Sequence, residues 1–195
     1  MPQVILLAGP NGAGKSTVAP RLLRGALGVQ EFVNADTIAS GISAFSPDSA
    51  AFQAGRVMLR RLSELSKRRK NFAFESTLSA RSFAPWLQHL KTKGYKVRIV
   101  FLFLPDHRLA IERVRQRVRL GGHDVPVPVI RRRYYAGVRN FFDLYMPLAD
   151  QWRIYDNSAL TPRLVAIGSK DSPYSRIIAV LDVWNEFVKL GKSHD

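Results

Sequence analysis

The sequence contains no cysteine among its 195 residues. This absence excludes disulfide bonds, thiolate metal sites and a cysteine nucleophile. There is also no apolar run near the roughly 18 to 20 residues that a membrane-spanning helix needs. The chain starts with a short apolar stretch and lacks the basic segment that begins a signal peptide. We therefore expect a cytoplasmic protein that has no membrane partner.

Acidic residues are scarce, because 15 Asp and Glu stand against 30 Lys and Arg and leave a net charge of +15. Arginine dominates the basic residues, with 21 Arg and 9 Lys. Residues 106–139 hold nine arginines and only three acidic residues, a net +6 that is 40% of the whole excess. The guanidinium fork matches phosphate oxygens. The charge thus points to a nucleotide, a phosphorylated sugar or a nucleic acid as ligand, although a solvated basic surface explains it equally well.

Hydrophobic residues make up 46% and charged residues 23% of the chain, which is typical of a globular protein and excludes a disordered one. Short apolar runs alternate with stretches of helical spacing. This alternation predicts one α/β domain over residues 1–195, with a mostly parallel sheet and helices on both faces. The expected strands cover residues 4–8, 31–34, 71–75, 97–104, 153–155 and 164–169, and the expected helices cover 15–26, 50–66 after a start at 46–49, 79–93, 107–120, 127–145 and 177–190.

A phosphate-binding loop follows the first expected strand. Residues 9–16 read GPNGAGKS and match G-x-x-x-x-G-K-[ST], with a strand before them and a helix that begins at Lys15. The glycines let backbone N–H groups face phosphate oxygens, and the helix N-terminus adds partial positive charge. Lys15 is expected to reach the β- and γ-phosphates of ATP, and Ser16 to ligate Mg²⁺. Asn157 and Ser158 follow a later strand and would border the adenine pocket, although a plain turn explains them equally well. The predicted ATP-binding residues of the loop are Gly9, Asn11, Gly12, Ala13, Gly14, Lys15, Ser16 and Thr17.

Two carboxylates follow expected strands at the edge of the sheet where such folds bind ligands. Asp36 comes after the strand 31–34, and Glu75 closes the strand 71–75. A small-molecule kinase needs a base near the acceptor hydroxyl and a carboxylate that holds metal or substrate. Both residues are candidates for these roles. The alternatives are that Asp36 caps a helix starting near Thr37, and that Glu75 forms a structural ion pair with an arginine.

An arginine-rich pair of helices is expected to form a lid over about residues 107–140. Arg113 and Arg117 share one helical face because they are four residues apart, and residues 131–133, all arginine, lie at the start of the returning helix. Two glycines between the helices offer a hinge. Such a lid excludes water from phosphoryl transfer and neutralises the charge that develops.

Seven segments carry a family resemblance, and they occur in order from about residue 3 to residue 158. They are GPNGAGKST at 9–17, FVNADTIA at 32–39, FAFESTLS at 72–79, GYKVRIVFLFL at 94–104, RVRQRVRLGGHDVP at 113–126, IRRRY at 130–134 and WRIYDNS at 152–158. Together they resemble the zeta toxin family, in particular its small stand-alone P-loop kinases. The phosphate loop is generic, whereas the segments with ESTLS, GGHDVP and YDNS are more specific.

The resemblance implies a P-loop kinase fold with an arginine-rich helical lid, and ATP with Mg²⁺ as cofactors. Zeta toxins phosphorylate the 3′-hydroxyl of UDP-N-acetylglucosamine, so the implied acceptor is this sugar nucleotide. By the resemblance Asp36 is the catalytic base, and Glu75, Ser76 and Thr77 bind substrate with it. The resemblance also adds an antitoxin protein as a candidate partner, which the residues themselves neither require nor exclude. The resemblance also implies that Lys15 and the lid arginines are catalytic. Among these arginines Arg117 is the first candidate, followed by Arg113, Arg132 or Arg133. Arg113 is also expected to bind the nucleotide.

Other functions remain open from the residues alone. The acceptor could instead be a nucleoside, an antibiotic or a nucleic-acid end, and the +15 charge favours the last of these. The sequence has no basic strand interleaved with aromatic residues, as single-stranded nucleic-acid platforms have. A non-catalytic ATP-binding switch is a further alternative, but it leaves Asp36 and the arginines unexplained.

Overall fold

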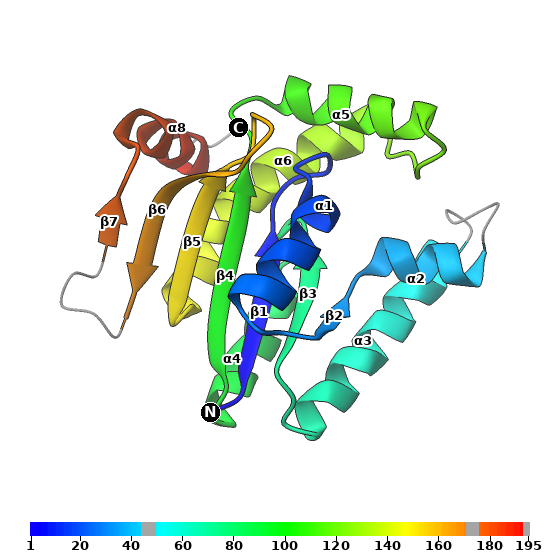
Figure 1. The fold of residues 1–195 in the computed structure, drawn as a ribbon, viewed down its shortest axis with the longest axis vertical. Coiled ribbons are helices and arrows are strands. Elements are labelled where there is room, and N and C mark those ends of the chain that lie inside the picture. Colours follow the sequence, from blue (N-terminus) through cyan, green and yellow to red (C-terminus); the bar gives the residue numbers. More distant parts are fainter. Residues whose placement is uncertain (44–49, 171–175, 193–195) are drawn as a thin grey trace.

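The computed structural model describes residues 1–43, 50–170 and 176–192, which form a seven-stranded sheet flanked by helices (Figure 1). The strand order is β2-β3-β1-β4-β5-β6-β7. No helix within these ranges is both long and apolar enough to span a bilayer. The strands are β1 Gln3–Ala8, β2 Glu31–Val33, β3 Phe72–Ser76, β4 Lys96–Phe103, β5 Gln151–Asp156, β6 Arg163–Ser169 and β7 Arg176–Ile178.

The parallel half of the sheet confirms the α/β fold predicted from the alternating pattern. β1 lies at the centre between β3 and β4, and it pairs with both in parallel. Its residues Val4 to Ala8 are completely buried, as expected for a strand covered on both faces. β5 continues the parallel order, whereas β6 and β7 are antiparallel. All the parallel strands therefore end at the same edge, where the phosphate loop follows β1.

The helices cover both faces of the sheet. Figure 1 shows α1 in front of the sheet and α4 and α6 behind it. Adjacent β4 residues illustrate the two faces: Phe101 contacts the aromatic rings of Phe141 and Phe187, whereas Leu102 shares a cavity wall with Val18 of α1. The helices are α1 Lys15–Ala19, the π-helix η1 Pro20–Ala26, α2 Ala35–Ile42, α3 Ala51–Lys67, α4 Phe83–Thr92, α5 His107–Arg119, α6 Val127–Asn140, the π-helix η2 Phe141–Tyr145, α7 Met146–Leu148 and α8 Leu181–Lys192.

Two expected helices differ from the prediction, one in its course and one in its start. The expected helix over 15–26 changes from α to π at Pro20, which has no N–H to donate to the carbonyl four residues earlier. The chain then uses wider hydrogen bonds, such as Leu27 N–H to Leu22 O at 3.1 Å. The helix expected over 79–93 begins only at Phe83. The proposed helix start at 46–49 lies outside the described residues.

The prediction of a terminal helix over 177–190 is wrong at its first residues. Ile177 pairs with Ile167 of β6 in an antiparallel ladder, and β7 ends at Ile178. The spacing of Ile177 and Leu181 imitates a helical stripe, but β-branched side chains favour the strand. The helix itself begins at Leu181, and it buries Trp184 and Phe187 as the pattern indicates.

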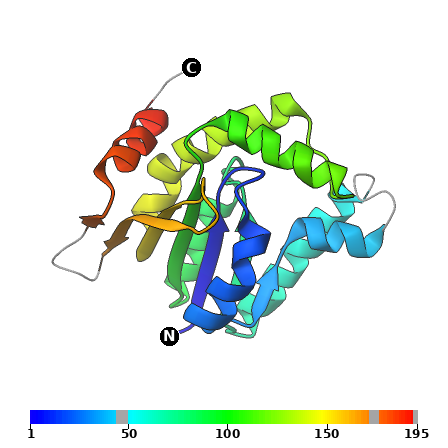
Figure 2. The ribbon, with the colours of Figure 1, turned by 45° about the horizontal axis from the view of Figure 1, so that its top comes forward.

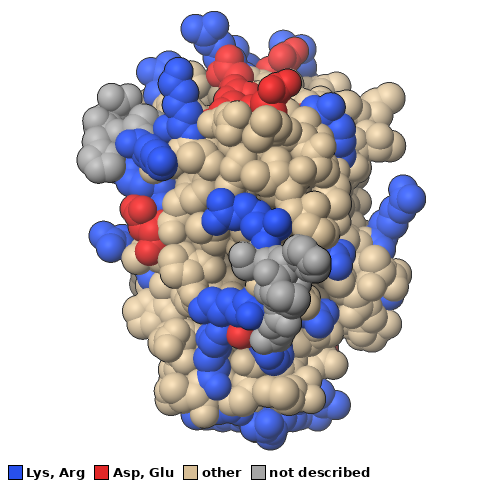
Figure 3. All heavy atoms as spheres, turned by 90° about the vertical axis from the view of Figure 1, so that its left-hand side faces the viewer, with Lys and Arg blue, Asp and Glu red and all other residues tan. Residues whose placement is uncertain are grey.

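Basic side chains are spread over the side of the molecule on which β7 and α8 lie, with few acidic ones among them (Figure 3). On this face the charge excess is dispersed over the surface and is not gathered into one groove. The picture fits a solvated basic surface on this side of the protein.

Phe187 anchors α8 to the sheet, and its removal should destabilise the fold. Its ring centroid lies 4.8 Å from that of Phe103, 5.0 Å from Phe142 and 5.1 Å from Phe101. We expect Phe187→Ala to lower the free energy of unfolding by about 3 to 5 kcal/mol, measured by urea denaturation. Phe52→Ala is the matched control, because the Phe52 side chain is 81% exposed. Equal losses in both variants would contradict the packing described.

Candidate active site

The phosphate loop connects β1 to α1 and leaves backbone N–H groups at the first turn of that helix. Gly12 and Gly14 have φ angles of +76° and +78°, which L side chains rarely adopt. A Cβ atom at Gly12 would lie 2.6 Å from the carbonyl oxygen of Ala110 in α5. Gly14 is the N-cap of α1 and provides no side-chain cap. The helix start therefore keeps donors available for an anion.

Lys15 is buried beneath the loop. Its Nζ donates to the carbonyl oxygens of Gly9 at 2.9 Å and Pro10 at 2.8 Å. The same Nζ lies 3.5 Å from Oε1 of Glu75. Burial lowers the pKa of the Lys15 ammonium, while the carboxylates of Glu75 and Asp36 oppose this shift. These two carboxylates therefore compensate part of the cost of a buried cation.

A polar network joins Glu75 to the loop. Ser16 Oγ donates to Oε2 of Glu75 at 3.0 Å, and Asn34 Nδ2 donates to the same oxygen at 2.6 Å. Asn34 Nδ2 also lies 3.2 Å from Ser16 Oγ. The structural alternative for Glu75, a pair with an arginine, is not what these contacts show, because its cation is Lys15. The hydroxyl and carboxylate oxygens are ligands that Mg²⁺ accepts, so the residues present fit this ion.

Asn34 was missed by the sequence reasoning, although an Asn directly before a helix is a recognisable N-cap signal. Its Oδ1 accepts from the backbone N–H groups of Asp36 at 2.8 Å and Thr37 at 3.1 Å. Asn34 is therefore the cap of α2, and the alternative of Asp36 as cap is wrong. One side chain thus connects the helix that bears Asp36 with Glu75 and Ser16.

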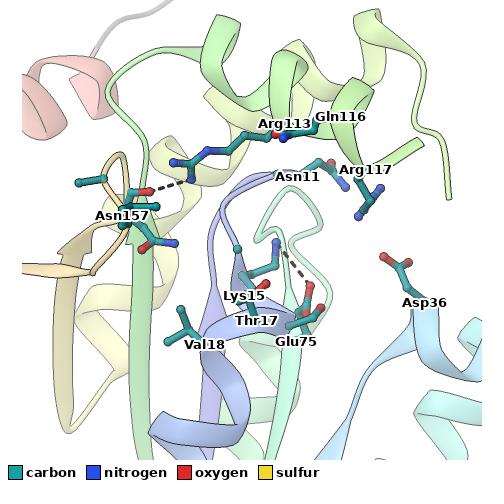
Figure 4. A pocket seen from close by; sticks show the side chains of 15 residues that line it. Asn11, Lys15, Thr17, Val18, Asp36, Glu75, Arg113, Gln116, Arg117 and Asn157 are labelled. Carbon is teal, nitrogen blue, oxygen red and sulfur yellow. Dashed lines mark hydrogen bonds and ion pairs between the residues drawn. The ribbon is translucent and has the colours of Figure 1, made fainter. Parts of the chain in front are cut away.

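Asp36 lies in the first turn of α2 and not at the end of a strand as expected. Its side chain is exposed, and in Figure 4 it points across the cavity that also holds Lys15, Glu75 and Arg117. Within residues 1–43, 50–170 and 176–192 its carboxylate has no hydrogen-bond or ion-pair partner. An unpaired carboxylate at a cavity mouth is accessible to a ligand hydroxyl.

Two cavities meet at these residues. The first, of about 410 Å³, lies over the phosphate loop and extends to Arg113, Arg117 and Asn157. The second, of about 340 Å³, lies between α2, α3 and the loop after β3. Their linings have four residues in common, namely Asn11, Lys15, Asp36 and Glu75. A ligand in either cavity would therefore contact the same group of one cation and two carboxylates.

Arg113 and Asn157 line the first cavity, but both use their side chains to hold the backbone. Arg113 donates from Nη1 to the carbonyl of Asn157 and from Nη2 to that of Ser158, both at 2.7 Å. Asn157 Nδ2 donates to the carbonyl oxygen of Ala13 at 2.7 Å. These bonds fasten the loop after β5 to the phosphate loop. The nucleotide-binding roles predicted for both residues stay predictions.

The lid arginines are divided between the two cavities. α5 and α6 lie side by side across the carboxyl edge of the sheet (Figure 2). Arg117 lines the first cavity, and its Nη2 donates to the carbonyl of His123 at 2.6 Å. Arg133 lines the second cavity. Arg132 is exposed and lines neither cavity, because successive helical residues diverge by about 100°.

Ser76 and Thr77, predicted to bind substrate, line the second cavity together with Ser79. Thr77 Oγ1 and Ser79 Oγ lie 2.9 Å apart, and Ser76 Oγ accepts from the N–H of Leu78 at 3.0 Å. Leu78 has a φ of +58°, so the chain turns sharply here. The turn explains why α4 starts later than the sequence indicates, and it creates a wall of hydroxyl groups.

The family described as AAA domain matches residues 4–136, more than half of the chain. A Haemophilus influenzae protein described as "Uncharacterized protein" is 29% identical over 132 residues, which is 68% of this chain and 92% of its own length.

Two solved structures share the fold. The AvrRxo1-ORF1:-ORF2 crystal structure with ATP has a TM-score of 0.76 and 17% identity over 100% of this chain, which spans 66% of that chain, just under two thirds. The structure from the PezAT chromosomal toxin-antitoxin system of Streptococcus pneumoniae has a TM-score of 0.60 and 20% identity, over 98% of this chain and 85% of that chain. The architecture is therefore the α/β P-loop kinase fold.

Substitutions of Asn34 should separate its capping role from its contact with Glu75. Asn34→Ala loses both, whereas Asn34→Ser keeps a side-chain cap and loses only the amide donor. We expect Asn34→Ala to be less stable than Asn34→Ser by about 1 kcal/mol, measured by urea denaturation. Equal free energies of unfolding in the two variants would contradict a stabilising role for the cap at the N–H groups of Asp36 and Thr37.

Proposed function

This chain belongs to the AAA domain family, and we propose that it is an ATP-dependent kinase that transfers the γ-phosphoryl group of ATP to a hydroxyl of a sugar nucleotide, UDP-N-acetylglucosamine. The observation that carries the proposal is the meeting of the two cavities at Lys15, Asp36 and Glu75. A phosphoryl group can move directly between two ligands only if their binding sites share a wall of this kind.

ATP is assigned to the first cavity. The phosphates would lie on the backbone N–H groups of the loop and the start of α1, with Lys15 at the terminal phosphates. Asn11 lies on the wall that both cavities share, and its Oδ1, a hydrogen-bond acceptor, has no partner within the described residues. Arg113 fastens the loop that would border the adenine. The solved neighbour with ATP has the same fold, which is consistent with this placement.

Mg²⁺ would be held by Ser16 and Glu75 together with the phosphates of ATP. Within the described residues, no group of three or more His, Cys, Asp or Glu could hold a metal ion without such a ligand. When bound, the ion would neutralise phosphate charge and orient the terminal phosphate. Asn34 Nδ2 contacts both Ser16 Oγ and Glu75 Oε2, and so holds the two oxygen ligands beside each other.

Asp36 is assigned as the general base for the acceptor in the second cavity. It accepts the proton of the acceptor hydroxyl while that oxygen forms the new bond to the γ-phosphorus. The bond from the γ-phosphorus to the bridging oxygen breaks, and ADP leaves. Lys15 and Arg117 stabilise the charge on the moving phosphoryl group. α5 with its arginines closes as a lid and excludes water, which would otherwise accept the phosphoryl group.

The identity of the acceptor rests on the resemblance to zeta toxins and on the second cavity. The three hydroxyl groups of Ser76, Thr77 and Ser79 offer hydrogen bonds to a polyhydroxyl ligand. UDP-N-acetylglucosamine supplies such hydroxyls and a diphosphate. An antitoxin partner stays a prediction for this chain.

The proposal is tested by ADP release in the presence of UDP-sugars, nucleosides and RNA ends, where UDP-N-acetylglucosamine should give the highest rate. A rate that is the same with every acceptor and with none would contradict a kinase.

Asp36→Asn should remove the base without removing the ATP site. We expect turnover to fall by about 10²- to 10⁴-fold while ATP affinity is retained, because the amide keeps the shape of the side chain but cannot take a proton. Turnover is measured as acceptor-dependent ADP release, and affinity by titration with ATP. Asp182→Asn in α8 is the matched control, since Asp182 is exposed and lines neither cavity. Near-normal turnover of Asp36→Asn would remove Asp36 from this role.

A further inference from the structure

Only one of three consecutive arginines in α6 faces the second cavity. Arg131 and Arg132 are exposed, whereas Arg133 is half-buried and lines the cavity together with Asp36. The residues on either side of this triplet fix the rotation of the helix. Ile130 and Tyr134 are each 1% exposed, and the Tyr134 hydroxyl donates to the carbonyl of Leu104 at 2.7 Å. The direction of Arg133 is therefore set by the core and not by a surface rotamer alone.

α6 is fastened to the loop after β3, which forms the hydroxyl wall of the same cavity. At Gly137 the helix approaches so closely that a Cβ atom would lie 2.3 Å from the carbonyl oxygen of Thr77. Asn140 Nδ2 donates to the carbonyl of Leu78 at 2.7 Å, and in the π-helix η2 that follows α6 the Tyr145 hydroxyl donates to the carbonyl of Ala80 at 2.6 Å. The helix that bears Arg133 is therefore held against the loop that forms the wall of the second cavity.

The guanidinium of Arg133 has no hydrogen bond or ion pair with any residue in the ranges 1–43, 50–170 and 176–192. The charges that act on it are the carboxylate of Asp36, which attracts it, and the neighbouring guanidinium of Arg132, which repels it. Burial lowers the pKa of the Arg133 guanidinium, and Arg132 lowers it further. A partly desolvated cation beside a like charge gains free energy from an anion that enters the cavity.

Two other cations of the site, Arg113 and Arg117, lie on the nucleotide side. Arg113 donates hydrogen bonds from both terminal nitrogens to loop carbonyls, and Arg117 lines the first cavity. Lys15 lies on the wall that both cavities share. Among these residues, Arg133 alone belongs to the second cavity and not to the first.

We propose that Arg133 is the anion anchor of the acceptor, and that the acceptor is a hydroxyl compound carrying a phosphate or diphosphate group. The anion binds the guanidinium fork, and the hydroxyl to be phosphorylated faces Asp36. This inference rests on the proposed kinase function and states which group of the acceptor the second cavity recognises and through which residue. It places Arg133, and not Arg132, among the residues that contact substrate.

The test compares Arg133→Gln with Arg132→Gln, which removes the same charge one residue away on the exposed side of the same helix. Arg133→Lys keeps the charge but not the fork. Binding of UDP-N-acetylglucosamine, UDP, a nucleoside monophosphate, a sugar phosphate and uncharged N-acetylglucosamine is measured by calorimetry without ATP. Acceptor KM and ATP KM are measured by ADP release, and urea denaturation checks that each variant is folded.

We expect Arg133→Gln to weaken binding of the anionic acceptor, and to raise its KM, by about 10- to 100-fold, the effect of one charge-assisted contact. Arg133→Lys should show a smaller loss, and Arg132→Gln should stay within about twofold of the wild type. The KM of ATP and any binding of the uncharged sugar should not change.

Three outcomes would overturn the proposal: equal effects of Arg133→Gln and Arg132→Gln, a rise in the KM of ATP with the acceptor KM unchanged, or wild-type protein that binds only the uncharged sugar. Transfer to a different anionic acceptor, with the same loss in Arg133→Gln, would remove UDP-N-acetylglucosamine from the proposed function but support the role of Arg133. Transfer to UDP-N-acetylglucosamine without that loss would support the proposed function but remove Arg133 from the role of anion anchor.

Discussion

The buried ion pair between Lys15 and Glu75 is the contact on which the site depends. A lysine beneath the phosphate loop is costly to bury, and the Glu75 carboxylate at 3.5 Å offsets part of that cost. The parallel pairing of β1 with β3 brings the two residues together, because Leu7 lies opposite Glu75 in the register. The Glu75 carboxylate, held here by Ser16 and Asn34, lies on the wall that the two cavities share.

Asn34 makes the second connection within the site, between the helix α2 and Glu75. Its amide caps α2 with the oxygen and holds Glu75 with the nitrogen, so the position of Asp36 is tied to the phosphate loop. The α5–α6 pair adds the cations, with Arg117 toward the first cavity and Arg133 toward the second. The division follows from the helices themselves, since α6 is bound to the loop after β3 whereas Arg117 lies near the end of α5. The donor and acceptor sides of the proposed reaction thus have different arginines, and they share Lys15 and the two carboxylates.

The parallel half of the sheet and the phosphate loop could be predicted from the sequence, because both have strong local patterns. The π-helical turn at Pro20 and the strand at Ile177 were not predicted, because the apolar spacing takes no account of the missing N–H of proline or of the β-branched side chains of Ile177 and Ile178. Spacing also could not choose between Arg132 and Arg133, because the rotation of α6 is fixed by burial of residues on either side. Asn34 carried a readable capping signal, but its contact with Glu75 exists only after β2 and β3 pair.

Simultaneous occupancy of the two cavities is the most direct measure of the central claim. The acceptor that supports ADP release is titrated by calorimetry into protein saturated with a non-hydrolysable ATP analogue, and into protein without it. If the two cavities are separate sites with a common wall, the acceptor binds in both cases, one molecule to each protein molecule. Binding that disappears when the analogue is present would mean that the two ligands compete for one site, and direct transfer between two cavities would be contradicted.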